Sequence, residues 1–215
     1  MSDFANLAVG LIMAGSAAIG ATRKVLERRR ARKELRSRPV LGAETDEGAV
    51  VRVTGVVRET DETLVAPISG RRCVVYRSRV MSAGGFVRRA FRPRESFAMV
   101  PFTLERDGDG IAVAIEGRHA LLDLPNLKLP APKTAELRQR RASFLALHAL
   151  KASAGGTFEE VVVEAGMRVT IAGLMMKDLT EAPPEGEAGY REDAPSTLRL
   201  AGDLAHPLVI GAADV

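Results

Sequence analysis

The sequence predicts a mainly β protein, a small OB-like barrel or sandwich with one inserted helix, preceded by an N-terminal transmembrane helix. From residue 49 onward, apolar residues alternate at the period of strands, in short segments separated by Gly, Pro and Asp. One later segment, 135–152, has a helical pattern, and residues 4–21 carry no charge. Many short strands with few helices are typical of a barrel or a sandwich. We expect a transmembrane helix in 1–21, a basic juxtamembrane helix and linker in 22–47, and a β-rich domain in 48–215.

The N-terminal run FANLAVGLIMAGSAAIGA contains 18 uncharged residues. As a helix it is about 27 Å long, which approaches the roughly 30 Å of a hydrocarbon core. Asp3 precedes the run and basic residues follow it, the opposite of a secretory signal. The positive-inside rule then places the N-terminus outside and residues 22–215 in the cytoplasm. The alternative is a buried helix of a soluble protein. Gly10, Ala14 and Ala18 form a small-residue stripe that could pair two such helices weakly.

The basicity of the chain is local. Nine of the 31 basic residues lie in 22–38 beside two acids, although the whole chain has a net charge of only +4. The remainder is therefore mildly acidic, which argues against nucleic acid as a partner. We expect the basic segment to continue as a helix until Pro39 and to lie near anionic lipid headgroups.

The body is expected to contain a series of short strands joined by turns. The expected strands are 49–57, 73–80, 98–105, 110–117, two within 157–176, 196–202 and 206–212. The segment 86–97 is less regular, and Pro93 favours an edge position there. Residues 106–110, RDGDG, are interpreted as a tight turn rather than a calcium loop, because the distal Glu of an EF-hand is missing. In 73–80 we expect Cys73 to share a face with Val75, and Val74 to share the other with Tyr76.

No motif in the sequence indicates catalysis. The chain has neither a G-x-S-x-G elbow nor a phosphate-binding glycine motif, and His119, His148 and His206 lack the spacing of metal ligands. One cysteine excludes an internal disulfide and a multi-cysteine zinc site. Cys73 is expected to be packed, and the alternative is an exposed thiol with a pKa lowered by the two arginines before it. We therefore expect a non-enzymatic protein without a cofactor or a metal.

Arginine is concentrated in one part of the body. Eight arginines and no acid lie between residues 71 and 94, and we take them as the candidate binding residues: Arg71, Arg72, Arg77, Arg79, Arg88, Arg89, Arg92 and Arg94. They could contact anionic headgroups, acidic protein segments or a nucleic-acid backbone. A membrane anchor nearby favours the first two uses.

The order of several motifs resembles the GIDE-type domain, also called the beside-a-membrane domain. The similar pieces are VTGVV (53–57), LVAPISGRRCVVYR (64–77), PF (101–102), DGDGIAV (107–113), EEVVVEAGMRVTIAG (159–173) and RLAGDLAHPLVI (199–210). The resemblance implies a membrane-tethered, β-rich interaction module. It also implies that six block residues are structural: Leu64, Ala66, Pro67, Ser69, Cys73 and Tyr76. The mitochondrial membrane-bound ubiquitin ligase of this family adds a RING, for which this chain lacks the cysteines, so ligase activity is not carried over.

The function that these observations favour is a single-span membrane protein with a non-enzymatic interaction or scaffold domain on the cytoplasmic face. Its protein partner is unknown. The alternatives are a membrane-bound enzyme that uses Cys73 or a histidine pair, and an OB-type nucleic-acid binder.

Overall fold

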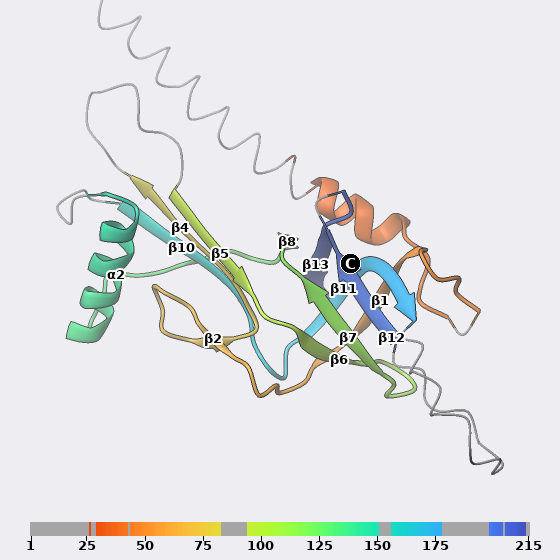
Figure 1. Ribbon diagram of the computed structural model, residues 1–215. Coiled ribbons are helices and arrows are strands. Elements are labelled where there is room, and N and C mark those ends of the chain that lie inside the picture. Colours follow the sequence, from red (N-terminus) through yellow and green to blue (C-terminus); the bar gives the residue numbers. More distant parts are fainter. Residues whose placement is uncertain are drawn as a thin grey trace, which may run out of the picture.

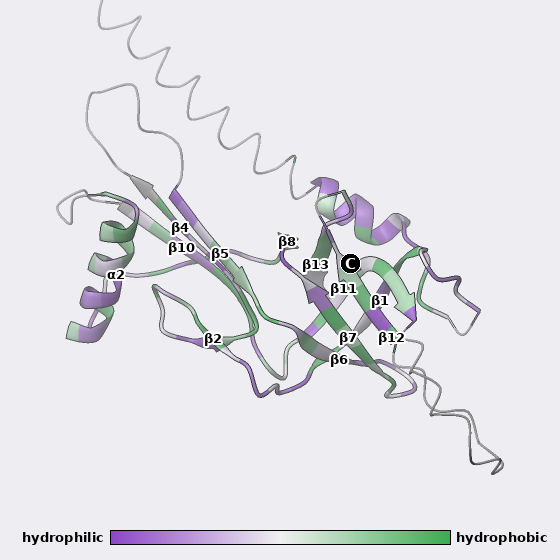
Figure 2. Ribbon diagram, viewed as in Figure 1, coloured by the Kyte–Doolittle hydropathy of each residue, from purple (hydrophilic) through white to green (hydrophobic). Residues whose placement is uncertain are grey.

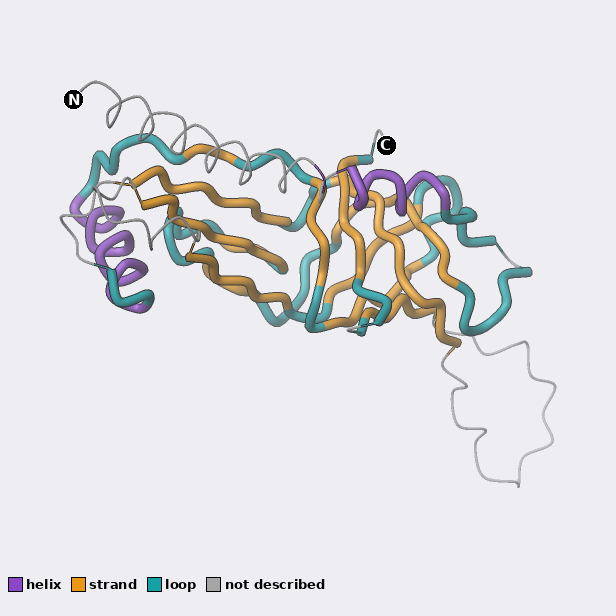
Figure 3. Tube along the Cα trace, turned by 90° about the horizontal axis from the view of Figure 1, so that it is seen from above, coloured by secondary structure: helices purple, strands orange, loops and turns teal. Residues whose placement is uncertain are grey.

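The structure is a computed structural model that describes Leu26 and residues 29–42, 44–82, 94–150, 156–177, 198–203 and 205–213. Within these residues it contains two sheets of more than two strands, together with a short β2–β3 hairpin and two helical segments. Figure 1 shows the two sheets side by side, and Figure 3 shows the same division from above.

The strands are short and follow one another closely along the chain. They are β1 (Val50–Val57), β2 (Leu64–Val65), β3 (Arg72–Cys73), β4 (Val75–Ser82), β5 (Arg94–Met99), β6 (Phe102–Arg106), β7 (Ala112–Gly117), β8 (Ala120–Asp123), β9 (Leu127–Lys128), β10 (Gly156–Val163), β11 (Arg168–Lys177), β12 (Leu198–Gly202) and β13 (Leu208–Ala212). The helix α2 (Ala135–Leu147) stands between β9 and β10.

Five strands close a barrel. The larger sheet has the order β1-β6-β7-β12-β11-β13-β8, and β1 also pairs with β11, so β1, β6, β7, β12 and β11 form a ring. Every neighbour in the ring is antiparallel except β7 and β12, which are parallel. Strand β13 extends this sheet beyond β11 and β8 extends it beyond β13. The expectation of a small β-barrel is confirmed.

Gly55 is required where β1 meets β6. A Cβ built on Gly55 would lie 2.0 Å from the backbone carbonyl oxygen of Glu105, which no side chain can occupy. In the structure Gly55 permits the close approach of two backbones.

The second sheet, with the order β5-β4-β10-β9, is built from two excursions out of the barrel. Residues between β1 and β6 supply β4 and β5, and residues between β7 and β11 supply β9, α2 and β10. We call this sheet with α2 and the β2–β3 hairpin the lobe. The barrel and the lobe share one apolar core, in which Val75, Val161 and Val163 of the lobe join Leu104, Ile171 and other barrel residues.

The basic segment is helical over 29–37 and packs against the barrel. Ala31 and Leu35 are buried with Ala172 and Val209, and Leu121 packs beside them. The exposed residues of the helical segment are polar, as its largely purple ribbon in Figure 2 shows. No helix within the described part of the chain is long and apolar enough to cross a membrane. The predicted span at 4–21 lies outside that part.

Two predicted elements have different boundaries. The expected strand 98–105 is two strands, because Pro101 cannot donate a ladder hydrogen bond and the chain passes there from the lobe to the barrel. The expected helix 135–152 ends at Leu147, where Ala149 takes a positive φ of 54° and the Leu150 N–H donates to the Leu145 carbonyl at 2.8 Å. The short strands β2, β8 and β9 were not predicted.

The predicted faces of 73–80 need one correction. The chain bends at Val74, between β3 and β4, so the alternation restarts there. Cys73 consequently clusters with Ala66, Val162 and Tyr76, whereas Val74 and Val75 both enter the main core. The expectation that Cys73 shares a face with Val75 is wrong.

Candidate interaction surface on the lobe

The turn at residues 66–70 is fixed by a buried carboxylate. Glu160, at the centre of β10, accepts hydrogen bonds from the Ser78 hydroxyl at 2.6 Å and from the backbone N–H groups of Ile68 at 3.2 Å and Ser69 at 3.1 Å. The side chain of Glu160 is 2% exposed, so each of these bonds is formed away from water. A buried carboxylate needs such donors, because desolvation without them is costly. The turn is therefore held against the sheet by charge-assisted bonds.

Gly70 closes the turn. It has a positive φ of 77°, and its N–H donates to the Ala66 carbonyl at 2.9 Å. A Cβ at this position would lie 3.0 Å from Nε of Arg140 on α2. Both the backbone conformation and the contact with α2 explain why glycine stands here.

Helix α2 rests on this turn through few side chains. Phe144 and Leu145 are its buried residues, and they form a cluster with Ile68, Val80 and Phe158. The Thr134 side chain caps the N-terminus by accepting from the Leu137 N–H at 3.2 Å. A short helix needs tertiary packing for stability, and here that packing comes from one end of the helix. The rest of α2 projects from the lobe, as Figures 1 and 3 show.

A groove of about 530 Å³ separates α2 from the turn. Its lining residues are Pro67, Glu136, Gln139, Arg140, Ser143, Phe144 and Leu147. Leu147 is 73% exposed, the largest value among the exposed large apolar residues described. Arg140 and Glu136 form an i,i+4 ion pair at 3.0 Å on its rim. The groove thus combines an apolar floor with a charged rim.

Most of the described candidate arginines contact groups of the same chain. Arg71 forms an ion pair with Glu164, Arg79 forms one with Glu95, and Arg72 donates to the Thr63 hydroxyl at 3.3 Å. Arg77 donates to Oδ1 of Asn126 at 3.4 Å and to the Leu122 carbonyl at 3.5 Å. Arg94 is exposed. Arg88, Arg89 and Arg92 lie outside the described residues.

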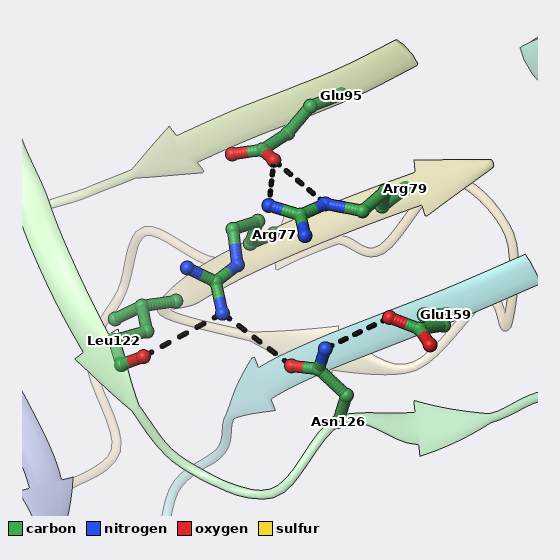
Figure 4. Close-up of polar contacts among 6 residues, drawn as sticks. All are labelled: Arg77, Arg79, Glu95, Leu122, Asn126 and Glu159. Carbon is green, nitrogen blue, oxygen red and sulfur yellow. Dashed lines mark hydrogen bonds and ion pairs between the residues drawn. The ribbon is translucent and has the colours of Figure 1, made fainter. Parts of the chain in front are cut away.

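Arg79 belongs to a row of alternating charges on the sheet face that Figure 4 shows. Glu95 of β5 and Glu159 of β10 are its cross-strand partners, and Lys128 of β9 is the partner of Glu159. Asn126 donates from Nδ2 to Glu159 at 2.9 Å and accepts from Arg77, so it links the two residues. Opposite charges at paired positions stabilise a sheet. The arginines of β4 are therefore part of an internally neutralised face.

Cys73 is buried, as predicted. Burial, together with the nearby carboxylates of Glu160 and Glu164, raises the pKa of its thiol from 9.0 to about 11. Because the thiolate is the nucleophilic form, Cys73 is unreactive at neutral pH. The alternative in which Arg71 and Arg72 activate an exposed thiol does not fit this environment.

The histidines do not converge. His148 is half-buried at the end of α2, with its ring 4.6 Å from that of Phe144, and its Nε2 has no hydrogen-bond partner among the described residues. His119 and His206 are exposed. Over the described ranges, no group of three potential metal ligands lies together.

The sequence reasoning missed Glu160 and the groove. Glu160 lies in the run TFEEVVV, where a charge within an apolar strand is the available signal for a buried, functional or structural carboxylate. The groove had no such signal, because Pro67 and Leu147 are 80 positions apart and meet only through tertiary packing.

Comparisons of the chain with models of protein families, with curated proteins and with solved structures find no match.

Proposed function

We propose that the chain is a single-span membrane protein whose β-rich domain is a non-enzymatic interaction module, with the groove between α2 and Pro67 as its binding site. The projection of α2 carries this proposal. Thirteen residues form a capped helix of which two are buried, and Leu147 is left exposed beside a groove. Exposed apolar residues next to a polar rim are typical of sites for protein partners.

The charge of the segment that carries α2 suggests the kind of partner. Residues 133–150 contain four basic side chains, Lys133, Arg138, Arg140 and Arg141, and one acid, Glu136. Complementary charge would favour a segment with acidic residues around one apolar anchor. In this proposal Arg94 and the undescribed Arg88, Arg89 and Arg92 remain a second candidate surface for anionic groups.

The anchor of this proposal is the uncharged run 4–21, which is supported by the basic residues that follow it. The proposed topology puts the domain in the cytoplasm. The GIDE-type resemblance agrees with this arrangement of a membrane-tethered β domain.

We also infer that the barrel is OB-like, since the OB fold is a five-stranded barrel. Nucleic-acid-binding OB folds use the outward face of their second and third strands, which correspond to β6 and β7. The outward residues there are Thr103, Glu105, Ala112, Ala114 and Glu116. Such binding needs aromatic platforms and a positive groove, so this face favours the protein-interaction hypothesis over the nucleic-acid hypothesis.

Site-specific photo-crosslinking in cells tests the proposal. A photoreactive amino acid at Ser143, in the groove, is expected to give a discrete crosslinked product, and adding Leu147→Glu is expected to remove it. The same probe at Ile111, which is exposed on the barrel, is the control. Equal products from both positions, or none from Ser143, would count against a binding site in the groove. Resistance of the full chain to alkaline carbonate extraction tests the anchor separately.

A further inference from the structure

The helical segment 29–37 has two opposite faces. Successive residues of an α-helix are about 100° apart, so residues spaced by three or four share a face. Ala31 and Leu35 are buried against the barrel. Arg29, Lys33 and Arg36, with Leu26 one turn earlier, occupy the side away from that contact, and all four are exposed. We call these four residues the outward stripe.

The docking of this helix is specific. Leu35 is fully buried, and the Arg32 side chain donates from Nε to the Asp123 carboxylate at 3.1 Å. The Asp123 side chain is 3% exposed, although the Arg32 side chain is 56% exposed. An apolar contact and a partly buried ion pair hold the helix on β11, β13 and β8 from one side. The helix therefore has one fixed orientation about its own axis relative to the barrel.

Two cations beside the docked face are paired. Arg38 pairs with Glu34 at 2.6 Å and Arg32 pairs with Asp123, so these cations are neutralised within the protein. The three cations of the outward stripe have no ion-pair or hydrogen-bond partner within the described part of the chain. Three unneutralised cations and one exposed leucine on a single face fit an anionic interface with an apolar layer beneath it.

We infer that the outward stripe lies on anionic lipid headgroups and, because the helix is docked, orients the whole barrel on the bilayer. This inference rests on the proposed membrane anchor, which ends at residue 21 and would deliver the helix to the surface. The chemistry is that of a basic amphipathic helix at an interface. The docked helix differs from a flexible tether, because it cannot rotate about its axis without removing Leu35 from its buried contact. The lobe is carried at the other end of the molecule, as Figures 1 and 3 show.

The test uses the full chain in lipid vesicles with a fluorophore at an introduced Ser37→Cys. Ser37 is exposed next to the stripe, and Cys73 is buried with a pKa raised to about 11, so the new thiol reacts selectively. The measured quantity is quenching by aqueous iodide in neutral vesicles and in vesicles with anionic lipid. Shielding of the fluorophore is expected with anionic lipid, and high salt is expected to weaken it.

Two charge variants complete the test. Arg29→Ser, Lys33→Ser and Arg36→Ser together are expected to abolish the shielding, because each cation contributes roughly fivefold to surface binding and the three together roughly 100-fold. Lys128→Ser, Lys133→Ser and Arg138→Ser remove the same charge from the lobe and are expected to leave the shielding intact. Equal quenching in neutral and anionic vesicles, equal effects of the two variants, or shielding by an RNA oligonucleotide without shielding by vesicles would overturn the inference.

The failure of this inference is distinguishable from failure of the anchor. Carbonate extraction of the wild type reports on the anchor alone, and the triple variant of the stripe should remain as resistant as the wild type. If carbonate extracts the chain but shielding still depends on lipid charge, the lipid contact of the outward stripe is supported and the transmembrane span is rejected. If the chain resists extraction but quenching does not depend on lipid charge, the transmembrane span is supported and the lipid contact of the outward stripe is rejected.

Discussion

The barrel and the lobe are held together in different ways. The barrel is closed by continuous strand pairing and filled by aliphatic side chains such as Leu104 and Ile171. Beyond the core that it shares with the barrel, the lobe depends on a small apolar cluster around Phe144 and on the hydrogen bonds of Glu160. Closed strand pairing suits a frame, whereas a projecting helix with two buried residues suits a part that meets a partner. The lobe is therefore the part of the molecule where we expect a partner to bind.

The largest effect is expected from the barrel core. Leu104→Ala removes a fully buried side chain and is expected to lower the free energy of unfolding by about 2–5 kcal/mol. Ile111→Ala, at an exposed position of the adjoining hairpin, is the matched control and should change it by less than about 0.5 kcal/mol. Urea denaturation of the purified full chain measures both. Similar losses for the two variants would reject the barrel as the stable frame.

The second largest effect is expected from loss of the Glu160 carboxylate, and it should be confined to the lobe. Glu160→Ala leaves the donors of Ile68, Ser69 and Ser78 without their acceptor and is expected to cost about 1–3 kcal/mol. Hydrogen exchange should speed up in 64–73 and α2 while β1 and β11 keep their protection. Glu164→Ala, which removes only the surface pair with Arg71, is the control. Uniform acceleration through the barrel would show that the two regions are not separable.

Cys73 gives a prediction with a defined pH dependence. Its pKa in the folded protein is raised to about 11 from 9.0, so the folded state binds more protons than the unfolded state between those values. The stabilising contribution is therefore present below pH 9 and is lost as the pH rises toward 11. Alkylation by iodoacetamide is expected to be slow at pH 8 in the native chain and fast in urea. Rapid native alkylation at pH 8 would reopen the hypothesis of a reactive thiol.

The smallest effect is expected from the charged row of the lobe. The pair of Arg79 and Glu95 is partly exposed, and its coupling energy should be about 0.2–1 kcal/mol. A double-mutant cycle with Arg79→Ser and Glu95→Gln measures this energy, and 1 M salt should reduce it. A coupling well above this range would show that the row supports the lobe as strongly as Glu160 does.

The sequence was sufficient to predict individual strands and turns. It was insufficient to predict which distant segments contact one another. Alternation in 49–57, 110–117 and 157–176 predicted strands that the structure contains, and the RDGDG turn forms with Gly108 and Gly110 at positive φ. Pro101 was present in the sequence, but only the fold reveals that it stands where the chain leaves one sheet for another.

The arginine-rich stretch 71–94 shows what could not be predicted about the candidate site from the sequence. Between residues 71 and 94 the sequence has no acid, which predicted an unneutralised patch. Strand pairing brings Glu95 to Arg79, and the turn after β10 brings Glu164 to Arg71. Neutralisation is a property of cross-strand neighbours, and neighbours 93 positions apart cannot be found from a window of the sequence.

The most direct measurement is hydrogen exchange of the full chain in vesicles with anionic lipid, resolved for 29–37, β11 and α2. We expect 29–37 to open with the same free energy as β11, because Leu35 and Arg32 dock it on the barrel, and α2 to open at a lower free energy. This result would establish a barrel mounted rigidly at the membrane that presents a more labile lobe. Exchange of 29–37 as fast as in a free peptide, or α2 as protected as β11, would contradict the account.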